Sequence, residues 1–257
     1  MVHDGIERAL RRLERRAPLS EAGRAAVRDL PYTLRSLDPA SYLLREGEPP
    51  AHCALLLSGL AFRHKLTGDG ARQILSVHMA GEFLDLQNSF LGVADHNVQA
   101  LTRVEVASVP VEALRVLVTE HPDVGRAMWI DTLIDAAIFR EWMVNVGRRH
   151  SLSRVAHLLC EFATRLQESG LAQEGGYELP MTQEQLADAT ALTPVHINRV
   201  LKELGRRGLI VRNKRSIAVA DWDALRHVGD FSTRYLHLND ASRPPPDRSA
   251  LTAEPAS

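Results

Sequence analysis

The sequence has few of the features that mark metalloproteins and membrane proteins. It has two cysteines in 257 residues, Cys53 and Cys160, so one chain cannot supply the four cysteines of a structural zinc site or an iron–sulfur cluster. No apolar run approaches the roughly 20 residues that span a bilayer. The charged N-terminus MVHDGIERALRRLERR lacks the apolar segment of a secretory signal. We therefore expect a cytoplasmic protein with no membrane partner.

Signatures of catalysis are also missing. The sequence has no Walker-type loop, dinucleotide fingerprint, Gly-x-Ser-x-Gly elbow or paired catalytic carboxylates. Its eleven histidines are scattered and form no His-x₃-His or His-Glu-x-x-His pattern. His64, His78 and His96 fall in one predicted domain and leave a metal or haem site open, although ordinary surface or packed histidines are the simpler interpretation. We expect no enzymatic activity, no cofactor and no metal.

The sequence does contain two short amphipathic helices followed by a basic hairpin, within Leu179–Val219. Thr182 and Gln185 have the spacing of a capping box at the start of the first helix. Thr193 is placed to cap the second helix, with Pro194 at its first helical position. This layout predicts a winged helix-turn-helix, a module that usually binds duplex DNA.

The second of these helices has two distinct faces. Apolar residues at intervals of three and four predict an inward face, made by Ile197, Val200, Leu201 and Leu204. Amide and guanidinium groups on the opposite face are suited to contact base edges in a major groove. The predicted outward residues are Val195, His196, Asn198, Arg199 and Lys202.

Positive charge is concentrated in this region. Seven lysines and arginines but only one acid, Glu203, lie between Thr193 and Arg215, in a chain whose formal net charge is -1. Phosphate binding requires clustered positive charge on one face, not a basic protein overall. We therefore expect Lys214 and Arg215, in the turn of the hairpin, to contact phosphate. The alternative is a solvated charged surface on an ordinary helical hairpin.

The N-terminal part of the chain has a different pattern. Residues 4–30 predict two short helices, the second capped by Ser20. From about Tyr32 to Pro110, short β-prone runs alternate with turn signals such as Thr67–Gly70. Such spacing without a long helix is typical of a small β-barrel or jelly roll.

A long helix is predicted between these two regions. Val111–Glu120 forms a short helix, and Pro122–Val146 continues as one long helical segment whose apolar residues recur at intervals of three and four. This approximates a coiled-coil seam and predicts a homodimer, although the same face could pack on the barrel wall. The predicted seam consists of Ala127, Ile130, Ile134, Ala137 and Glu141. Gly147–His150 is predicted to be a hinge, and Ser151 to cap the next helix.

The order of these parts resembles the cyclic-AMP receptor/FNR (Crp/Fnr) family of bacterial transcription regulators. The specific segments are SLSRVAHLLCEFA and MTQEQLADATALTPVHINRVLKELGRRGLI, with looser matches in REGEPP and GEFLDLQNSFLG. The resemblance covers roughly residues 10–225. It implies an α+β fold with a cyclic-nucleotide-binding-like β-roll (1–121), a dimerisation helix and hinge (122–150) and a winged helix (151–239). A disordered tail (240–257) is predicted from its composition.

The resemblance also implies a homodimer that binds a palindromic double-stranded DNA site and contacts RNA polymerase. By position, Thr182 and Gln183 would contact phosphate, while His196, Asn198 and Arg199 would face the groove beside the cap Thr193. Pro194-Val195 stand where the family commonly carries an Arg-Glu pair. A signalling adaptor whose winged helix binds protein is the alternative from another class.

The predicted sensor departs from the cyclic-nucleotide binders of the family. Asp85-Leu86 stand where those proteins carry Gly-Glu, and His96-Asn97 stand where they carry Arg-Ser or Arg-Thr. No arginine lies between Gly81 and Leu101, and a buried phosphate without a charged partner costs several kcal/mol. We therefore expect a regulator with an unusual effector or none, and a cyclic-nucleotide-responsive regulator as the alternative.

Overall fold

The computed structural model describes residues 2–171, 177–213 and 216–238. The chain opens with two helices, α1 (Val2–Arg16) and α2 (Glu21–Arg28). As predicted, Ser20 caps α2, because its Oγ accepts a hydrogen bond from the Gly23 amide at 3.0 Å. The apolar face of α1 packs against the first sheet, so Leu10 and Leu13 are buried.

Eight short strands between Thr33 and Pro110 form a β-roll of two antiparallel sheets, ordered β1-β8-β3-β6 and β2-β7-β4-β5. The predicted turn Thr67–Gly70 joins β4 to β5; the Thr67 amide donates to the Ala71 carbonyl at 2.9 Å. The strands are β1 (Thr33–Leu37), β2 (Tyr42–Leu44), β3 (His52–Ser58), β4 (Leu60–Leu66), β5 (Arg72–Met79), β6 (Phe83–Leu84), β7 (Asn97–Ala100) and β8 (Val104–Pro110), with a short helix α3 (Asn88–Leu91) before β7.

Three helices follow the roll: α4 (Val111–Glu120), α5 (Pro122–Arg148) and α6 (Ser151–Glu168). The hinge predicted at Gly147–His150 is too long. Helix α5 continues through Arg148, so two residues, Arg149 and His150, lie between α5 and α6. The predicted cap at Ser151 is also wrong. Ser151 is the first residue of α6, and the capping position is held by His150 without a side-chain hydrogen bond.

The C-terminal part is a winged helix, as predicted. Its three-stranded sheet has the order β10-β11-β9. The elements are β9 (Tyr177–Glu178), α7 (Gln183–Thr190), α8 (Pro194–Arg206), β10 (Ile210–Asn213), β11 (Ser216–Val219), α9 (Trp222–Val228) and the 3₁₀ helix η1 (Thr233–Leu236). Asp221 caps α9, as predicted, by accepting from the Ala224 amide at 3.0 Å.

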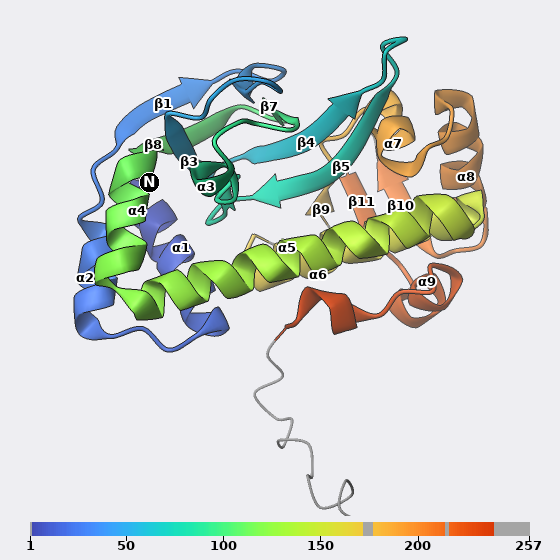
Figure 1. Cartoon of the computed structure of the whole chain (residues 1–257). Helices are drawn as coiled ribbons and strands as arrows, with labels where there is room; N and C mark the ends of the chain where they lie inside the picture. Colours follow the sequence, from blue (N-terminus) through green and yellow to red (C-terminus); the bar gives the residue numbers. More distant parts are fainter. Residues whose placement is uncertain (1, 172–176, 214–215, 239–257) are drawn as a thin grey trace, which may run out of the picture.

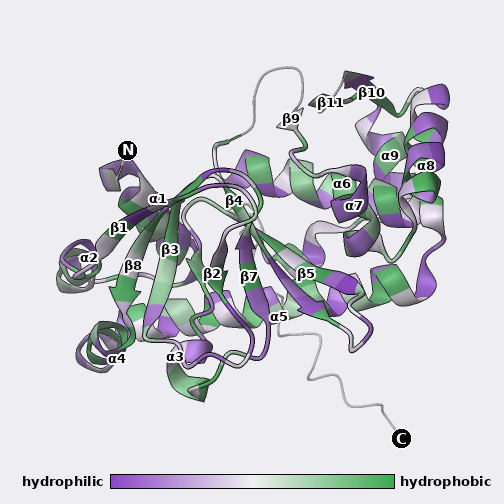
Figure 2. Ribbon diagram, turned by 90° about the horizontal axis from the view of Figure 1, so that it is seen from above, coloured by the Kyte–Doolittle hydropathy of each residue, from purple (hydrophilic) through white to green (hydrophobic). Residues whose placement is uncertain are grey.

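Helix α5 runs along both halves of the molecule, with the roll over its first part and the winged helix at its other end (Figure 1). The same division is visible from above (Figure 2). Helix α7 packs against β5, where the Arg72 Nε lies 2.7 Å from the Asp188 carboxylate. One hydrophobic cluster therefore includes residues of the roll, α5, α6 and the winged helix.

Both cysteines are buried and unpaired. The Cys53 thiol donates to the Leu84 carbonyl at 2.9 Å, and Cys160 lies in the cluster shared by the two halves. Burial raises the pKa of Cys53, and it raises that of Cys160 to about 12. None of the described helices is long and apolar enough to cross a membrane.

Candidate nucleic-acid interface and sensor site

Side-chain caps fix the start of both helices of the helix-turn-helix. The Thr182 hydroxyl accepts from the Gln185 amide at 3.1 Å, and the Gln185 side chain accepts from the Thr182 amide at 2.9 Å. Thr193 accepts from the His196 amide at 3.3 Å, with Pro194 at the first helical position. The capping box and the proline are therefore confirmed. Both threonine hydroxyls are engaged in capping the helices.

The two faces of α8 are as predicted. Its inward residues are buried: Ile197, Val200, Leu201 and Leu204. On the outer face Val195, His196, Arg199 and Lys202 are exposed, while Asn198 is half-buried. In the first helix, Thr182 is exposed and Gln183 half-buried. Because the apolar face anchors α8 in the core, the polar face is presented to solvent on a rigid element.

The cations of α8 fall into two groups. Arg206 and Arg207 are held by Glu203, at 2.8 and 2.7 Å. Arg199 and Lys202 have no ion pair or side-chain hydrogen bond to any part of the chain that the structure describes. These two side chains are therefore available to an anionic partner. Lys214 and Arg215 lie outside the described residues.

The turn of the helix-turn-helix is tied to the end of α5. Ala191 adopts the left-handed region, with φ of +51°, which lets the chain turn between α7 and α8. The Arg154 guanidinium donates to the Thr190 carbonyl at 3.1 Å and to the Arg149 carbonyl at 2.8 Å. These contacts hold α8 in place relative to the hinge.

An ionic cluster fills the interior of the roll. Asp85 accepts from the Arg63 Nε at 2.7 Å and pairs with the His96 Nε2 at 2.7 Å. The same guanidinium donates to Asp135 on α5. Asp85 and His96, both predicted sensor residues, are thus brought together. Asp85 binds both His96 and Arg63 of the same chain.

The protonation of this cluster follows from its geometry. Burial raises the pKa of Asp85, but Arg63 and His96 outweigh it and hold that pKa well below its usual value. Burial lowers the pKa of His96, but the hydrogen bond and the charge of Asp85 outweigh it, so the pKa of His96 is raised. The cluster therefore favours the ionised form of Asp85 beside the Arg63 guanidinium, and it favours the protonated form of His96.

The other two predicted sensor residues have separate roles. The Asn97 side chain accepts from the Glu46 amide at 3.1 Å, and Leu86 is buried between the roll and α5. A residual cavity of about 20 Å³ remains beside Arg63, Leu86 and Asp135. Small-molecule sites usually have a few hundred Å³, so this cavity, with its side chains as they lie, is too small for a nucleotide.

Arg63 and Asp135 were not predicted from the sequence to belong to this cluster. Arg63 comes from β4, far from the segment aligned with the phosphate-binding residues. The available signal was an arginine inside the otherwise apolar run LAFR of a predicted strand, because a buried arginine requires a partner.

The three roll histidines do not share a site. His78 lies 2.8 Å from Glu82, and His96 pairs with Asp85 and Asp95. Neither ring nitrogen of the buried His64 has a hydrogen-bond partner among the residues that the structure describes. Across residues 2–171, 177–213 and 216–238, no group of three or more His, Cys, Asp or Glu side chains is arranged to hold a metal ion.

The side chains predicted to form a dimer seam on α5 mostly face their own chain. Ala127, Ile134 and Ala137 are 0%, 5% and 7% exposed because they pack against the same chain. Ile130 is half-buried against the same core, and Glu141 bonds the Arg149 guanidinium at 2.6 Å. Large apolar side chains are instead exposed elsewhere on the surface of the helix, at Trp129, Leu133 and Met143.

Comparisons with known proteins agree with this architecture. A family model described as a cyclic nucleotide-binding domain matches residues 34–121, and one described as a Crp-like helix-turn-helix domain matches residues 153–228. A probable transcriptional activator of Rhizobium leguminosarum bv. viciae is 27% identical over 195 residues, which cover 76% of this chain and 80% of that protein.

Two further relatives extend the comparison. The transcriptional activator protein FnrL of Cereibacter sphaeroides is 26% identical over 203 residues, covering 77% of this chain and 81% of that protein. The structure of FixK2 from Bradyrhizobium japonicum superimposes with a TM-score of 0.71 at 25% identity, covering 77% of this chain and 98% of that chain.

A nucleotide-binding-like roll joined by a long helix to a winged helix defines a sensor-linked DNA-binding regulator. The chain belongs to the Crp/Fnr family of transcription regulators. The predicted fold class is confirmed, and so is the prediction of a DNA-binding regulator, not an enzyme.

Proposed function

We propose that this protein acts as a homodimer that binds a palindromic DNA site and needs no cyclic nucleotide to do so. The observation that carries the proposal is the exposed face of α8, where Arg199 and Lys202 have no partner among the described residues. Guanidinium groups bind guanine in the major groove, while ammonium groups bind phosphate.

We assign each predicted DNA-contact residue a role. Arg199, His196 and Asn198 face base edges, and Lys202 faces phosphate. Thr182, Gln183 and Thr193 lie at the two helix starts, where backbone amides and side chains approach the DNA backbone. Lys214 and Arg215 contact phosphate from the wing. We also propose, from family membership, that the bound dimer contacts RNA polymerase.

We propose that the dimer forms through the exposed face of α5. Trp129, Leu133, Ala136, Arg140 and Met143 recur at intervals of four, three, four and three, which is the spacing of a coiled-coil seam. Trp129 and Met143 are 64% and 61% exposed. Four of these five residues are apolar. An exposed, mostly apolar stripe on an isolated chain favours a partner helix, and a second copy offers the same stripe around a two-fold axis.

The roll supports regulation without a cyclic nucleotide. Asp85 occupies the Arg63 guanidinium, and the residual cavity beside it has about 20 Å³, far below the few hundred Å³ of a small-molecule site. Binding a nucleotide there would require breaking the Arg63–Asp85 pair and opening the cavity.

Selection from a pool of random duplexes tests the proposal. We expect enrichment of an inverted repeat, bound with a log–log salt slope of several phosphate equivalents, in the absence of any added nucleotide. A Lys214→Ala/Arg215→Ala variant should flatten that slope by about two equivalents. Absence of salt-dependent duplex binding would instead favour the adaptor alternative.

A further inference from the structure

The chain continues past the winged helix into a segment that returns to the long helix. Residues 229–238, here called the C-terminal strap, follow α9 and lie beyond the matched helix-turn-helix domain, which ends at residue 228. The strap includes η1, which lies against α5 (Figure 1). Phe231 and Leu236 are 5% and 2% exposed and belong to the cluster shared by the roll, α5 and α6.

The strap is bonded to α6. The Tyr235 hydroxyl donates to the Glu161 carboxylate at 2.7 Å and lies 3.0 Å from the His157 Nε2. The His157 Nδ1 donates to the Gly229 carbonyl at 3.1 Å. Burial lowers the pKa of His157, and its Nδ1 can donate to the start of the strap whether or not Nε2 carries a proton.

The same groups connect the strap to α5 and to the hinge. Glu161 accepts from the Trp142 Nε1 of α5 at 3.0 Å. Arg149, in the two-residue hinge, bonds Glu141 of α5 at 2.6 Å and Asp230 of the strap at 3.1 Å. The strap therefore bonds directly to α6 and to the hinge, and it reaches α5 through Glu161, through Arg149 and through the packing of η1.

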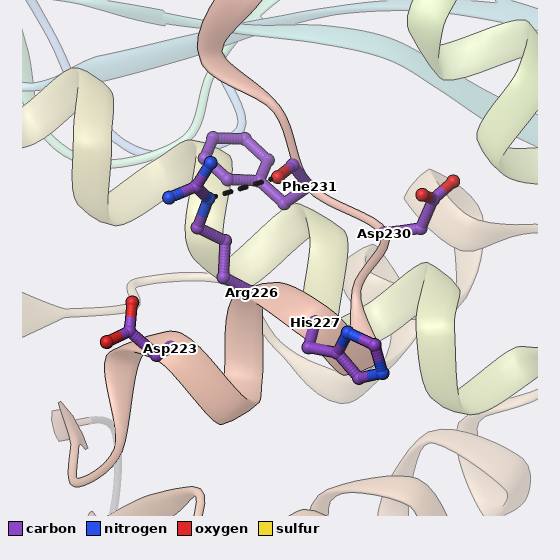
Figure 3. A pocket seen from close by; sticks show the side chains of 5 residues that line it. All are labelled: Asp223, Arg226, His227, Asp230 and Phe231. Atoms are coloured by element: carbon purple, nitrogen blue, oxygen red, sulfur yellow. Dashed lines mark hydrogen bonds between the residues drawn. The ribbon is translucent and has the colours of Figure 1, made fainter.

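The start of the strap is held close to α6. A Cβ at Gly229 would lie 2.8 Å from the His157 backbone nitrogen and 3.0 Å from the Ala156 carbonyl carbon. Its φ is −76°, so steric contact, not backbone strain, requires the glycine. The Arg226 Nε donates to the Phe231 carbonyl at 3.2 Å across the turn between α9 and the strap, beside a shallow hollow of about 300 Å³ (Figure 3).

We infer that the C-terminal strap is a positioning element for DNA binding: it fixes the angle between α5 and the winged helix, and thereby the spacing of the two α8 helices in the dimer. This inference rests on the proposed function. A two-residue hinge leaves that angle soft, because few backbone dihedrals hold it. The polar cluster that bridges α5, the hinge and α6 restricts it, since breaking the bonds of the buried Glu161 and His157 would leave unsatisfied buried groups.

Gly229→Ala tests the inference, with Gly68→Ala as the matched control. A Cβ at Gly68 meets nothing within 4 Å, and its φ is not in the left-handed region. Binding is measured to the selected palindrome, to one half-site, and to palindromes with one base pair added or removed at the centre. We expect Gly229→Ala to lose at least tenfold on the palindrome and at most twofold on the half-site, and to discriminate less between spacings. Equal losses on palindrome and half-site, or no loss, would overturn the inference.

Tyr235→Phe keeps the aromatic ring in place and removes only the hydroxyl. It therefore tests the hydrogen bonds of Tyr235 to α6 even if Gly229→Ala does not fold. We expect the same pattern, with a several-fold loss. Hydrogen exchange of the amides at residues 149–154 provides a readout that needs no DNA. Faster exchange there in either strap variant, but not in Gly68→Ala, supports the inference even if the wild type binds no palindrome, which would refute the proposed function alone. Unchanged exchange in both strap variants would overturn the inference that the strap positions the winged helix.

Discussion

Arg63 and Asp85 form an ion pair inside the roll, with side chains that are 10% and 6% exposed and a separation of 2.7 Å. Burying two opposite charges costs desolvation free energy, and removing one of the two partners costs more. Because Arg63 also bonds Asp135, the pair connects the roll to the helix that we propose to mediate dimerisation.

Removing one member of this pair should cost more than removing both. Arg63→Met removes the guanidinium from two carboxylates, the buried Asp85, which keeps His96 and Gln87, and Asp135, so we expect a loss of about 3–5 kcal/mol in the free energy of unfolding. Arg63→Met/Asp85→Leu should lose clearly less than the sum of the single variants. Urea unfolding of the four proteins of the cycle measures this coupling. Additive losses would show that the pair contributes no interaction energy.

Cyclic AMP and cyclic GMP should leave the protein unchanged. A cyclic phosphate would need a cationic partner, and the Arg63 guanidinium is already bound by Asp85. A ligand at 100 times its dissociation constant stabilises a fold by about 2.7 kcal/mol, which a melting curve detects readily. We expect no shift with either nucleotide at micromolar concentration and pH 7.5, and no change in DNA affinity. A clear shift together with tighter DNA binding would contradict this description of the roll.

Arg199→Ala should weaken and broaden DNA recognition. A guanidinium that bonds guanine bidentately contributes about 1–3 kcal/mol of discrimination, so affinity for the selected site should fall while binding to random duplex changes little. Arg207→Ala is the control, because Arg207 is held by Glu203. Equal losses on specific and random duplexes would assign Arg199 to phosphate.

Leu133→Arg should yield monomers. Leu133 is 48% exposed in the single chain, so an arginine there is tolerated in the monomer but places like charges together across a two-fold seam. Val116→Arg on α4, at a residue 45% exposed, is the matched control. Sedimentation measures the state of both variants. A dimeric Leu133→Arg protein would locate the interface on another surface.

His64→Leu should stabilise the protein, increasingly so in mild acid. Burial lowers the pKa of His64 to about 4, whereas an unfolded histidine titrates near 6.5. Between these values the unfolded chain binds more protons, so this residue makes stability fall as pH drops from about 6.5 to about 4.

The orphaned ring of His64 adds a penalty of about 1–3 kcal/mol at neutral pH. Urea unfolding at pH 7 and pH 5 measures both effects, with the exposed His52→Leu as control. An equally acid-sensitive His64→Leu protein would assign the pH dependence to other groups.

Features that depend on neighbours in sequence were predictable. The Thr182–Gln185 capping box, the Thr193 cap and the Thr67–Gly70 turn are set by a few adjacent residues, so residue type and spacing suffice. The order of roll, long helix and winged helix follows from changes in hydrophobic period along the chain.

Features that depend on packing between residues far apart in the sequence were not predictable. Helix α5 has apolar residues on two faces, and the sequence does not state which face the roll and α6 cover. The period therefore led to Ile134, which is buried, and not to Leu133, which is exposed. In the same way, Arg63 reaches Asp85 and Asp135 only once β4 lies beside α5.

The two buried thiols have a practical consequence. With a pKa of about 12 at Cys160 and a raised pKa at Cys53, neither sulfur forms appreciable thiolate at neutral pH, and thiolate is the species that alkylating reagents and peroxides attack. A fluorophore attached through a single cysteine introduced at His196 should therefore label the outer face of α8 alone, without first replacing the native cysteines.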